Sequence, residues 1–401
     1  MLSIAIFQYL IIACTNPTND SGQHSPFSLE EQGHLDYMSL DISVPIEEDS
    51  SNQYRYDEAT IRFGETLFSS TILSKNGEIA CASCHQIDNY FTDSLSLSQG
   101  LQTTRRSAPT LLGLQRQRWF NWDGACDSAW CQAIGPLEKD GEMGTSRIAL
   151  AHTILEHYKT DYEAIFGTLP PNIADWPTEG KPTMEEWEQI SESIQIDSTQ
   201  ILVNVAKAID AYEYTLSPPK RRLDDFFEQY REDQQSAFDF LSSVEQKGLD
   251  LFLNEGRCVL CHAGPTLSNG EFHNIGLGMR DWLDPLDIGR YDGIDSLRNS
   301  TFNSAGIWSD DSEGIKAKRI SRLNQKTEQL GQFKTPTLRE IGNTAPYMHG
   351  GHFETLDEVL HFYSNLDEEP THGHRDETLQ IQDWTEEDID ALLAFLAMTS
   401  E

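Results

Sequence analysis

Two copies of one short cysteine and histidine pattern are the residues best suited to chemistry in this sequence. The pattern is C-x-x-C-H, formed by Cys81, Cys84 and His85 and again by Cys258, Cys261 and His262. In this spacing the two thiols can bond the vinyl groups of a c-type haem, and the adjacent histidine becomes the proximal iron ligand. A redox C-x-x-C pair or a zinc site would not need a histidine after each pair. The sequence therefore predicts two covalently attached haems.

A second shared element precedes each attachment pattern. Residues 64–68 (GETLF) lie before the first copy, and residues 248–252 (GLDLF) lie before the second. The element G-x-x-L-F in the same relative place indicates an internal duplication, whose unit is a helix that enters a haem-attachment loop. Chance similarity of two amphipathic helices is the alternative.

The remaining pattern is mainly helical. Residues 147–166 and 199–215 carry apolar side chains at a spacing of three to four, and strand-like alternation is scarce. Thr385 and Asp388 resemble a capping box that opens a last amphipathic helix. We expect two cytochrome c-like domains, over residues 57–235 and 236–401. Residues 15–56 are polar and predict a tether with at most one short docked segment.

The N-terminus predicts export. Residues 1–14 are apolar but too short to span a bilayer as a helix. Ala13 before Cys14 resembles the end of a lipoprotein signal, although the usual basic residues are missing. We expect a protein of the periplasm or cell envelope, with Cys14 as a lipid anchor. A plain secretory signal is the alternative.

Composition limits the partners of this chain. It has 29 Lys and Arg against 65 Asp and Glu, a formal net charge of −36, which argues against nucleic acid and anionic lipid head groups. The acidity suits a basic partner, or it only keeps the protein soluble.

Cys126 and Cys131 could close a small disulfide loop in an oxidising compartment, or they are two free thiols packed in a turn.

Several longer blocks carry a family resemblance from about Asp57 to the C-terminus. These blocks are FTD (91–93), RRSAPTLL (105–112), WDG (122–124), QAIGPLEKDGEMG (132–144), EFHNIG (271–276) and FKTPTLREIGNTAPYMHGG (333–351). On them the chain resembles the bacterial di-haem cytochrome c peroxidase family, which includes the MauG proteins of methylamine utilisation.

The resemblance implies roles for four residues of the N-terminal half. Gln132, Pro136 and Glu142 match residues on the peroxide-binding face of the first haem, where a carboxylate can move a proton and an amide can donate to developing negative charge. Trp122 matches the tryptophan between the two haems. Apart from the resemblance, Gln132 and Glu142 would be a surface amide and a solvated carboxylate, and Trp122 a core residue.

Two positions depart from the ordinary peroxidases of the family. Where these have a histidine that caps the first haem at rest, this chain has Leu101, so the resemblance implies an open iron face. Where these have a methionine ligand to the second haem, this chain has Tyr363, as MauG-like proteins do. Tyr363 is the expected axial ligand, with Met348, His349 or no ligand as alternatives.

The family also has a calcium ion between the haems. Thr344 and Pro346 match its backbone-carbonyl ligands, but Ser107 replaces the usual asparagine. A hydroxyl is a poorer calcium ligand than an amide carbonyl, so the match is incomplete.

Three functions are consistent with these residues. The first is an enzyme that reduces hydrogen peroxide to water with electrons from a small cytochrome or cupredoxin. The second is a MauG-like oxidase that uses peroxide to oxidise Tyr or Trp side chains of a partner protein. The third is a pure electron carrier, which would need six ligands on both irons.

Overall fold

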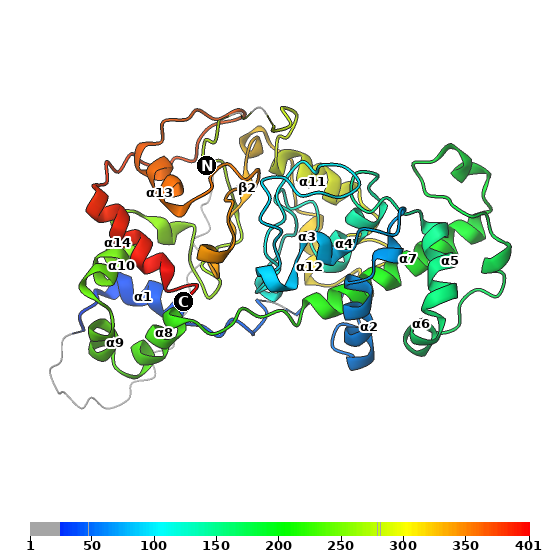
Figure 1. Ribbon diagram of the computed structural model, residues 1–401, viewed down its shortest axis with the longest axis horizontal. Coiled ribbons are helices and arrows are strands. Elements are labelled where there is room, and N and C mark those ends of the chain that lie inside the picture. The colour runs from blue at the N-terminus through cyan, green and yellow to red at the C-terminus, as the bar shows by residue number, and fades with distance from the viewer. Residues whose placement is uncertain (1–24, 47, 279, 281) are drawn as a thin grey trace, which may run out of the picture.

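The computed structural model describes residues 25–46, 48–278, 280 and 282–401. It is mainly helical, as predicted, and its helices form two lobes that lie side by side along the long axis (Figure 1). The predicted signal over residues 1–14 and the lipid site at Cys14 lie outside the described residues, as do residues 15–24 of the expected tether.

The first lobe is built around one long central helix. Its helices are α2 (Glu58–Phe68), α3 (Cys81–Cys84), α4 (Ala129–Glu138), α5 (Arg147–His157), α6 (Lys159–Phe166) and α7 (Glu192–Glu213). The C-terminal half of α7 is buried on all sides, which fits its contacts with α2, α4 and α5. The expected helix over 199–215 is therefore present but begins earlier, and the expected helical stretch 147–166 is broken into α5 and α6 at Tyr158.

The second lobe contains the N-terminal helix as well as the C-terminal ones. Its elements are α1 (Leu29–Met38), α8 (Arg222–Glu232), α9 (Gln234–Phe240), α10 (Ser243–Leu253), α13 (Leu356–Asn365) and α14 (Glu386–Ala397). The predicted capping box is confirmed, because Thr385 N donates to the Asp388 carboxylate and Asp388 N donates to the Thr385 hydroxyl at the start of α14.

A two-stranded ribbon and two short helices connect the lobes. Strand β1 (Phe272–His273) pairs antiparallel with β2 (Phe333–Lys334), with Phe272 opposite Lys334. Helices α11 (Arg290–Asn299) and α12 (Ile315–Ile320) lie between them in the chain. Phe302 and Trp308, from the segment between α11 and α12, pack against the core of the first lobe. The C-terminal half of the chain thus contributes to both lobes.

The same helix pair recurs in each lobe. A Cβ atom on Gly64 of α2 would lie 1.9 Å from the carbonyl oxygen of Ala208 on α7, and one on Gly248 of α10 would lie 2.0 Å from that of Ala391 on α14. Glycine allows this close approach because it has no side chain. The glycine of each G-x-x-L-F element therefore allows two helix backbones to contact each other.

The change from one core to the other does not fall near residue 235, where we expected it. The core of the first lobe ends at Leu216, and Leu223, Phe226 and Tyr230 of α8 already belong to the core of the second. The polar run around residue 230 is the exposed face of amphipathic helices, whereas the crossing is the proline-containing segment 217–220 (SPPK).

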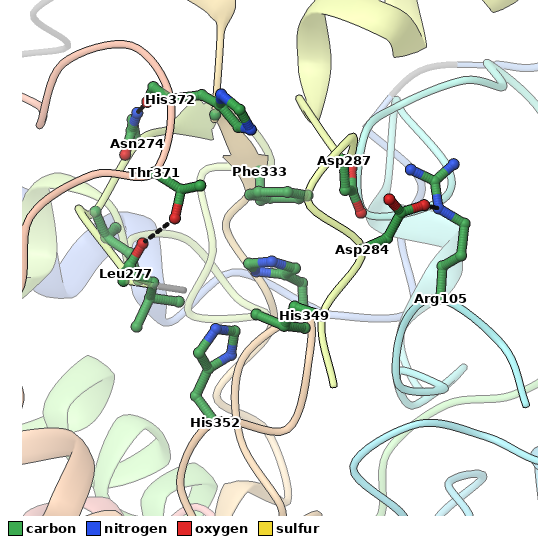
Figure 2. A pocket seen from close by; sticks show the side chains of 14 residues that line it. Arg105, Asn274, Leu277, Asp284, Asp287, Phe333, His349, His352, Thr371 and His372 are labelled. Carbon is green, nitrogen blue, oxygen red and sulfur yellow. Dashed lines mark hydrogen bonds and ion pairs between the residues drawn. The ribbon is translucent and has the colours of Figure 1, made fainter. Parts of the chain in front are cut away.

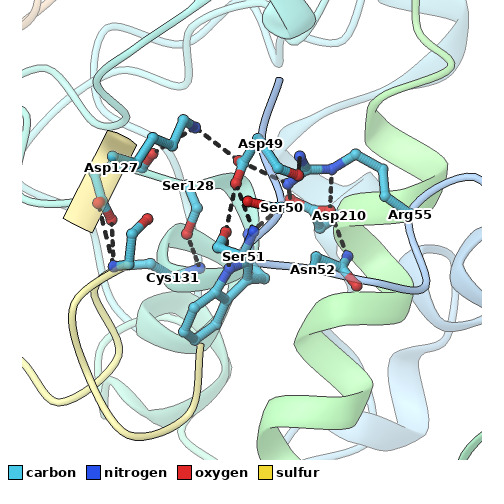
Figure 3. Close-up of polar contacts among 12 residues, drawn as sticks. Asp49, Ser50, Ser51, Asn52, Arg55, Asp127, Ser128, Cys131 and Asp210 are labelled. Carbon is cyan, nitrogen blue, oxygen red and sulfur yellow. Dashed lines mark hydrogen bonds and ion pairs between the residues drawn. The ribbon is translucent and has the colours of Figure 1, made fainter. Parts of the chain in front are cut away.

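The prediction of a tether over residues 15–56 also differs from the structure for its described part. Helix α1 places Leu35 and Met38 in the core of the second lobe. Further along, Arg55 is buried in the first lobe, where its guanidinium pairs with Asp49 at 2.9 Å and with Asp210 at 2.8 Å (Figure 3). The polar residues Asp49, Ser51, Asn52 and Arg55 are buried in this network, whereas residues 48, 50 and 53 are exposed.

Lys316 completes this network from the second half of the chain. Its ammonium lies 2.7 Å from Asp49 and donates to the carbonyl oxygen of Asp127. Figure 3 shows Asp49 close to Ser51 and Asp210, with Asp127 on the side of Ser128. Three distant segments are thus joined in one buried cluster.

Within the described residues, the helices are all too short or too polar to cross a membrane.

Candidate functional site

The two predicted proximal histidines are held in the same way. His85 Nδ1 lies 3.0 Å from the carbonyl oxygen of Phe91, and His262 Nδ1 lies 2.9 Å from that of Leu267. An imidazole that donates its Nδ1–H to a carbonyl keeps the Nε2 lone pair available for a metal and is fixed in direction. Burial lowers the pKa of both rings, to about 4 for His262, which favours the neutral form that ligates iron.

The four cysteines of the attachment patterns are unpaired thiols. Cys81 and Cys84 bound the single turn of α3, and Cys258 begins a short 3₁₀ turn, Cys258–Leu260. Burial raises the pKa of Cys84 to about 11 and that of Cys258 to about 12. Such thiols stay protonated at neutral pH, unlike those of a thiolate metal site. Among the described residues, His, Cys, Asp and Glu form no group of three that could hold a metal ion.

A large apolar hollow accompanies the second attachment pattern. We call it the C-terminal cavity; it has an empty volume of about 1470 Å³, and its lining includes Phe252, Cys258, Cys261, His262, Leu338, Leu360, Tyr363 and Leu392. Two thiols and one imidazole thus converge on a hollow lined mostly by apolar side chains. This donor set and this lining fit a covalently attached haem, which is flat, apolar and needs one nitrogen ligand.

All three candidates for the second axial ligand line the C-terminal cavity. These are Tyr363, Met348 and His349. Tyr363 lies on α13, and burial raises the pKa of its hydroxyl, with smaller contributions from Cys261 and Cys258. The ring of His349 is engaged elsewhere, since it stacks on Phe333 with centroids 3.6 Å apart.

The three residues expected on the peroxide-binding face come from one helix and the loop after it. Gln132 and Pro136 are four residues apart on α4 and share a half-buried face. The loop folds back so that Met143 N donates to Pro136 O at 3.0 Å, which brings Glu142 beside α4. Among the described residues, no group forms a hydrogen bond with the side-chain amide of Gln132, whereas its backbone N–H donates to Ser128 O at 3.1 Å.

Glu142 lies within electrostatic reach of the first attachment pattern. Burial is the main cause of the shifted pKa values of Cys81, Cys84 and His85, and the charge of Glu142 contributes to each of them. Its carboxylate also lies 3.0 Å from Lys139 Nζ and is about one quarter exposed. The structure therefore brings Glu142 to the predicted haem, with an ion pair that the sequence did not indicate.

The position of Leu101 is fixed by the loop that carries Glu142. Leu101 N donates to Glu142 O, and Gln102 N donates to Gly141 O, both at 2.9 Å. The segment that would hold a distal histidine is thus paired with the loop that carries Glu142, and it has an aliphatic side chain at this position. A leucine cannot ligate iron.

Trp122 lies at the junction of the lobes. Its indole Nε1 donates to Ser107 O at 3.0 Å, its ring centroid is 6.4 Å from that of His349, and it lines the C-terminal cavity. The role of Trp122 between the two haems stays a prediction.

Ser107, one of the expected calcium ligands, forms hydrogen bonds to backbone oxygens instead. Its hydroxyl donates to Met348 O at 3.1 Å, and its N–H donates to His349 O at 2.9 Å. Thr344 and Pro346 lie a few residues earlier, around the 3₁₀ turn Ile341–Asn343. A hydroxyl used as a donor to the backbone suits a calcium ion poorly.

Cys126 and Cys131 are joined by a disulfide, which decides between the two readings that the sequence left open. The bond links the segment after Trp122 to the first turn of α4, one residue before Gln132. Two elements of the candidate site are therefore covalently connected.

A second, more polar hollow adjoins the C-terminal cavity and was not expected from the sequence. We call it the junction pocket; Figure 2 shows His349, His352 and Phe333 around it, with Asp284 paired to Arg105 at its edge. His352 is buried, and neither of its ring nitrogens has a hydrogen-bond partner among the described residues. His349 and Phe333 line both hollows.

Two further polar residues line the C-terminal cavity without an assigned role from sequence. His273 Nδ1 lies 2.6 Å from Asp376, and Lys334 carries a buried ammonium. Both belong to blocks of the family resemblance (271–276 and 333–351), which was the only sequence signal for them.

Comparison with known proteins decides the family. A model of the family described as "Di-haem cytochrome c peroxidase" matches residues 58–233, the part that holds the first attachment pattern and the Gln132 to Glu142 block. Curated relatives carry the match beyond this part. Cytochrome-c peroxidase IdrP2 of Denitromonas iodatirespirans is 27% identical over 313 residues, which is 76% of this chain and 73% of that protein.

Residues 58–233 of the chain belong to the di-haem cytochrome c peroxidase family. Within the family the chain is similar to both branches named above: Methylamine utilization protein MauG of Methylophilus methylotrophus is 24% identical over 79% of this chain and 74% of that protein. Because these identities are low, the activity of the present chain is argued from its own residues.

Solved structures agree with the fold of this family member. A MauG-like protein associated with microbial copper homeostasis superposes with a TM-score of 0.63 at 23% identity, covering 90% of this chain and 94% of that one. The diheme peroxidase BthA from Burkholderia thailandensis also gives 0.63, at 20% identity, covering 90% and 88%.

Proposed function

We propose that this protein reduces hydrogen peroxide to water with electrons from a small cytochrome or cupredoxin. The observation that carries the proposal is the pairing of Leu101 N with Glu142 O. It places an aliphatic residue where a capping ligand would come from, and it holds the carboxylate of Glu142 near Cys81 and His85. An open face beside a proton-transferring group is what peroxide cleavage needs.

The reaction takes two electrons and two protons per peroxide and forms two waters. The haem supplies the iron on which the O–O bond is cleaved. Glu142 moves a proton from the oxygen nearer the iron to the leaving oxygen, and the unpartnered amide of Gln132 donates a hydrogen bond to the charge that develops there. Pro136, one turn after Gln132, keeps that face of α4 apolar.

The second lobe stores and delivers electrons in this proposal. Cys258 and Cys261 would hold its haem, and His262 and Tyr363 would supply ligands to its iron. Trp122, at the junction of the lobes, passes electrons between the two haems. The equivalent contacts of Gly64 and Gly248 support an origin of the two lobes by duplication of one cytochrome c-like unit, with the boundary in the segment 217–220.

A MauG-like reaction is the second candidate, in which the oxidising equivalents are drawn from Tyr or Trp side chains of a partner protein. Leu101 and Tyr363 favour it over an ordinary peroxidase, because both depart from the peroxidase pattern in the MauG direction. Covalent haem and the Cys126–Cys131 disulfide favour the periplasm or envelope for either reaction. Anchoring at Cys14 stays a prediction.

Peroxide added to the resting ferric protein tests the proposal. We expect a rapid change in the haem spectrum, and an EPR spectrum at rest with one high-spin and one low-spin ferric signal. Steady oxidation of reduced cytochrome c would identify a peroxidase. A spectral reaction without such turnover would point to the oxidation of a protein side chain, and an inert spectrum would leave only an electron carrier.

Variants make the test specific to Glu142. Glu142→Gln should slow the reaction with peroxide by about 10²–10⁴-fold, the usual size of an acid–base contribution. The matched control is Glu156→Gln, which neutralises an exposed carboxylate on α5. Equal rates in the two variants would remove Glu142 from the mechanism.

A further inference from the structure

Lys334 is a half-buried cation that has no carboxylate partner in the described part of the chain. Its ammonium donates to the Trp119 carbonyl oxygen at 2.9 Å and to the side-chain oxygen of Gln117. Both acceptors are neutral, and an ammonium has three N–H donors, so one donor is left over. Burying a lysine without a counter-charge is costly, and burial lowers its pKa to about 7.

The nearby acidic group is already engaged. Asp123 is the charge that acts on Lys334, but its carboxylate lies 2.8 Å from the guanidinium of Arg106. Arg290, which is buried here, donates only to the carbonyl oxygens of Asp123 and Gly124. Arg106 also pairs with Asp287, at 2.7 Å. Lys334 therefore has no free carboxylate beside it among the described residues.

The strand register places Lys334 between the C-terminal cavity and the first lobe. Lys334 lines the cavity, and it follows Phe333, whose ring faces His349. The bonds of its ammonium to Trp119 O and to Gln117 place it where the cavity borders the first lobe. Its own N–H donates to the carbonyl oxygen of Trp122 at 2.8 Å.

We propose that the Lys334 ammonium is the counter-ion of a propionate of the C-terminal haem. A haem carries two propionate carboxylates on the edge away from its attached vinyl groups, and so away from Cys258 and Cys261. A cavity that receives this haem therefore receives the missing negative charge. Of the other charged residues that line the cavity, His273 pairs with Asp376, and Arg257 directly precedes Cys258, on the side of the attached vinyl groups. This inference rests on the proposed haem in the C-terminal cavity.

The contact would also tie the haem to the residue between the two irons. One lysine would bond the propionate, Trp119 O and, through its backbone, Trp122 O. Lys334 is thus a positioning residue for the path between the haems, besides setting the charge around the second one.

Redox titration of the C-terminal haem in the full-length protein tests this role. Lys334→Met should lower its midpoint potential, because loss of a positive charge favours ferric iron. At a fixed potential, the ratio of reduced to oxidised haem should change by about tenfold. For a one-electron couple this corresponds to a shift of about 59 mV in the midpoint potential. Lys334→Arg should restore most of it. The control Lys326→Met removes an exposed charge and should leave the potential unchanged.

Vibrational spectroscopy of the unaltered protein covers the case in which Lys334→Met does not fold. The propionate bands of the C-terminal haem should be those of a hydrogen-bonded carboxylate, and should change in Lys334→Arg. Propionate bands typical of free, solvated carboxylates, or equal potentials in Lys334→Met and Lys326→Met, would overturn the inference. Two haems by mass and an intact peroxide reaction in the same samples would show that the proposed function survives that failure.

Discussion

The backbone of Gly64 on α2 lies directly against the carbonyl oxygen of Ala208 on α7, and Gly248 on α10 meets Ala391 on α14 in the same way. In each lobe this contact fixes the helix that leads into a haem-attachment loop. The two glycines are therefore the points at which a minimal substitution tests the repeated architecture.

Gly64→Ala should destabilise the first lobe. The added Cβ would lie 1.9 Å from Ala208 O, a backbone atom that cannot rotate away, so the helices must separate. We expect a loss of about 1–3 kcal/mol in the free energy of unfolding, and the same for Gly248→Ala in the second lobe. Gly33→Ala on α1, where a Cβ meets no atom within 4 Å, should be neutral or stabilising. Denaturant unfolding curves with equal midpoints for all three variants would contradict the contact.

Arg55→Met tests whether residues 48–57 are part of the first lobe. The change leaves Asp49 and Asp210 buried with one partner fewer, which should cost about 3–5 kcal/mol. The exposed pair of Arg62 with Glu58 gives the control, since Arg62→Met should change stability by about 0.5 kcal/mol or less. Thermal unfolding measures both. A small effect of Arg55→Met would mean that this segment is a solvated tether after all.

Tyr363→Phe tests the axial ligand of the second haem. The variant keeps the buried ring of α13 but loses the hydroxyl, so one of the two resting ferric EPR signals should change while the other stays. Tyr291→Phe on α11 is the control and should leave both signals unaltered. If the spectrum of Tyr363→Phe matched the wild type, Met348→Leu and His349→Gln would be the next variants, since both residues line the same cavity.

The capping box of α10 gives a pH dependence with a defined sign. Hydrogen bonds from Arg222 and from Ser242, at the start of α10, lower the pKa of Glu245 to about 2. A carboxyl group whose pKa is lower in the folded state stabilises it above the unfolded value, near 4.5, and loses this effect as pH falls toward 2.

The Glu245→Gln variant should follow that sign. It should be less stable than the wild type by about 1 kcal/mol at pH 7, and the difference should shrink between pH 4.5 and 2. Melting temperatures of the two proteins across this range measure it, with the exposed Glu232→Gln as the control. A difference that grew on acidification would contradict the assigned sign.

Much of the site was determined by the sequence alone. Cys81, Cys84 and His85, and their second copy, are neighbours along the chain, so their joint chemistry needs no knowledge of the fold. The helical class and the capping box at Thr385 are local in the same sense, because they depend on residues within one or two turns. The match of residues 132–144 also placed Glu142 and Pro136 together, which the folded loop now explains.

The tertiary structure decided what depends on contacts between distant segments. The sequence cannot distinguish a solvated Arg55 from one buried against Asp210, because the two residues are far apart in the chain and each is polar in either case. The same holds for the core boundary at residues 217–220 and for the isolation of Lys334, whose missing counter-charge becomes evident only when all its neighbours are known. Burial and charge balance are properties of the assembled chain, and only the folded structure reveals them.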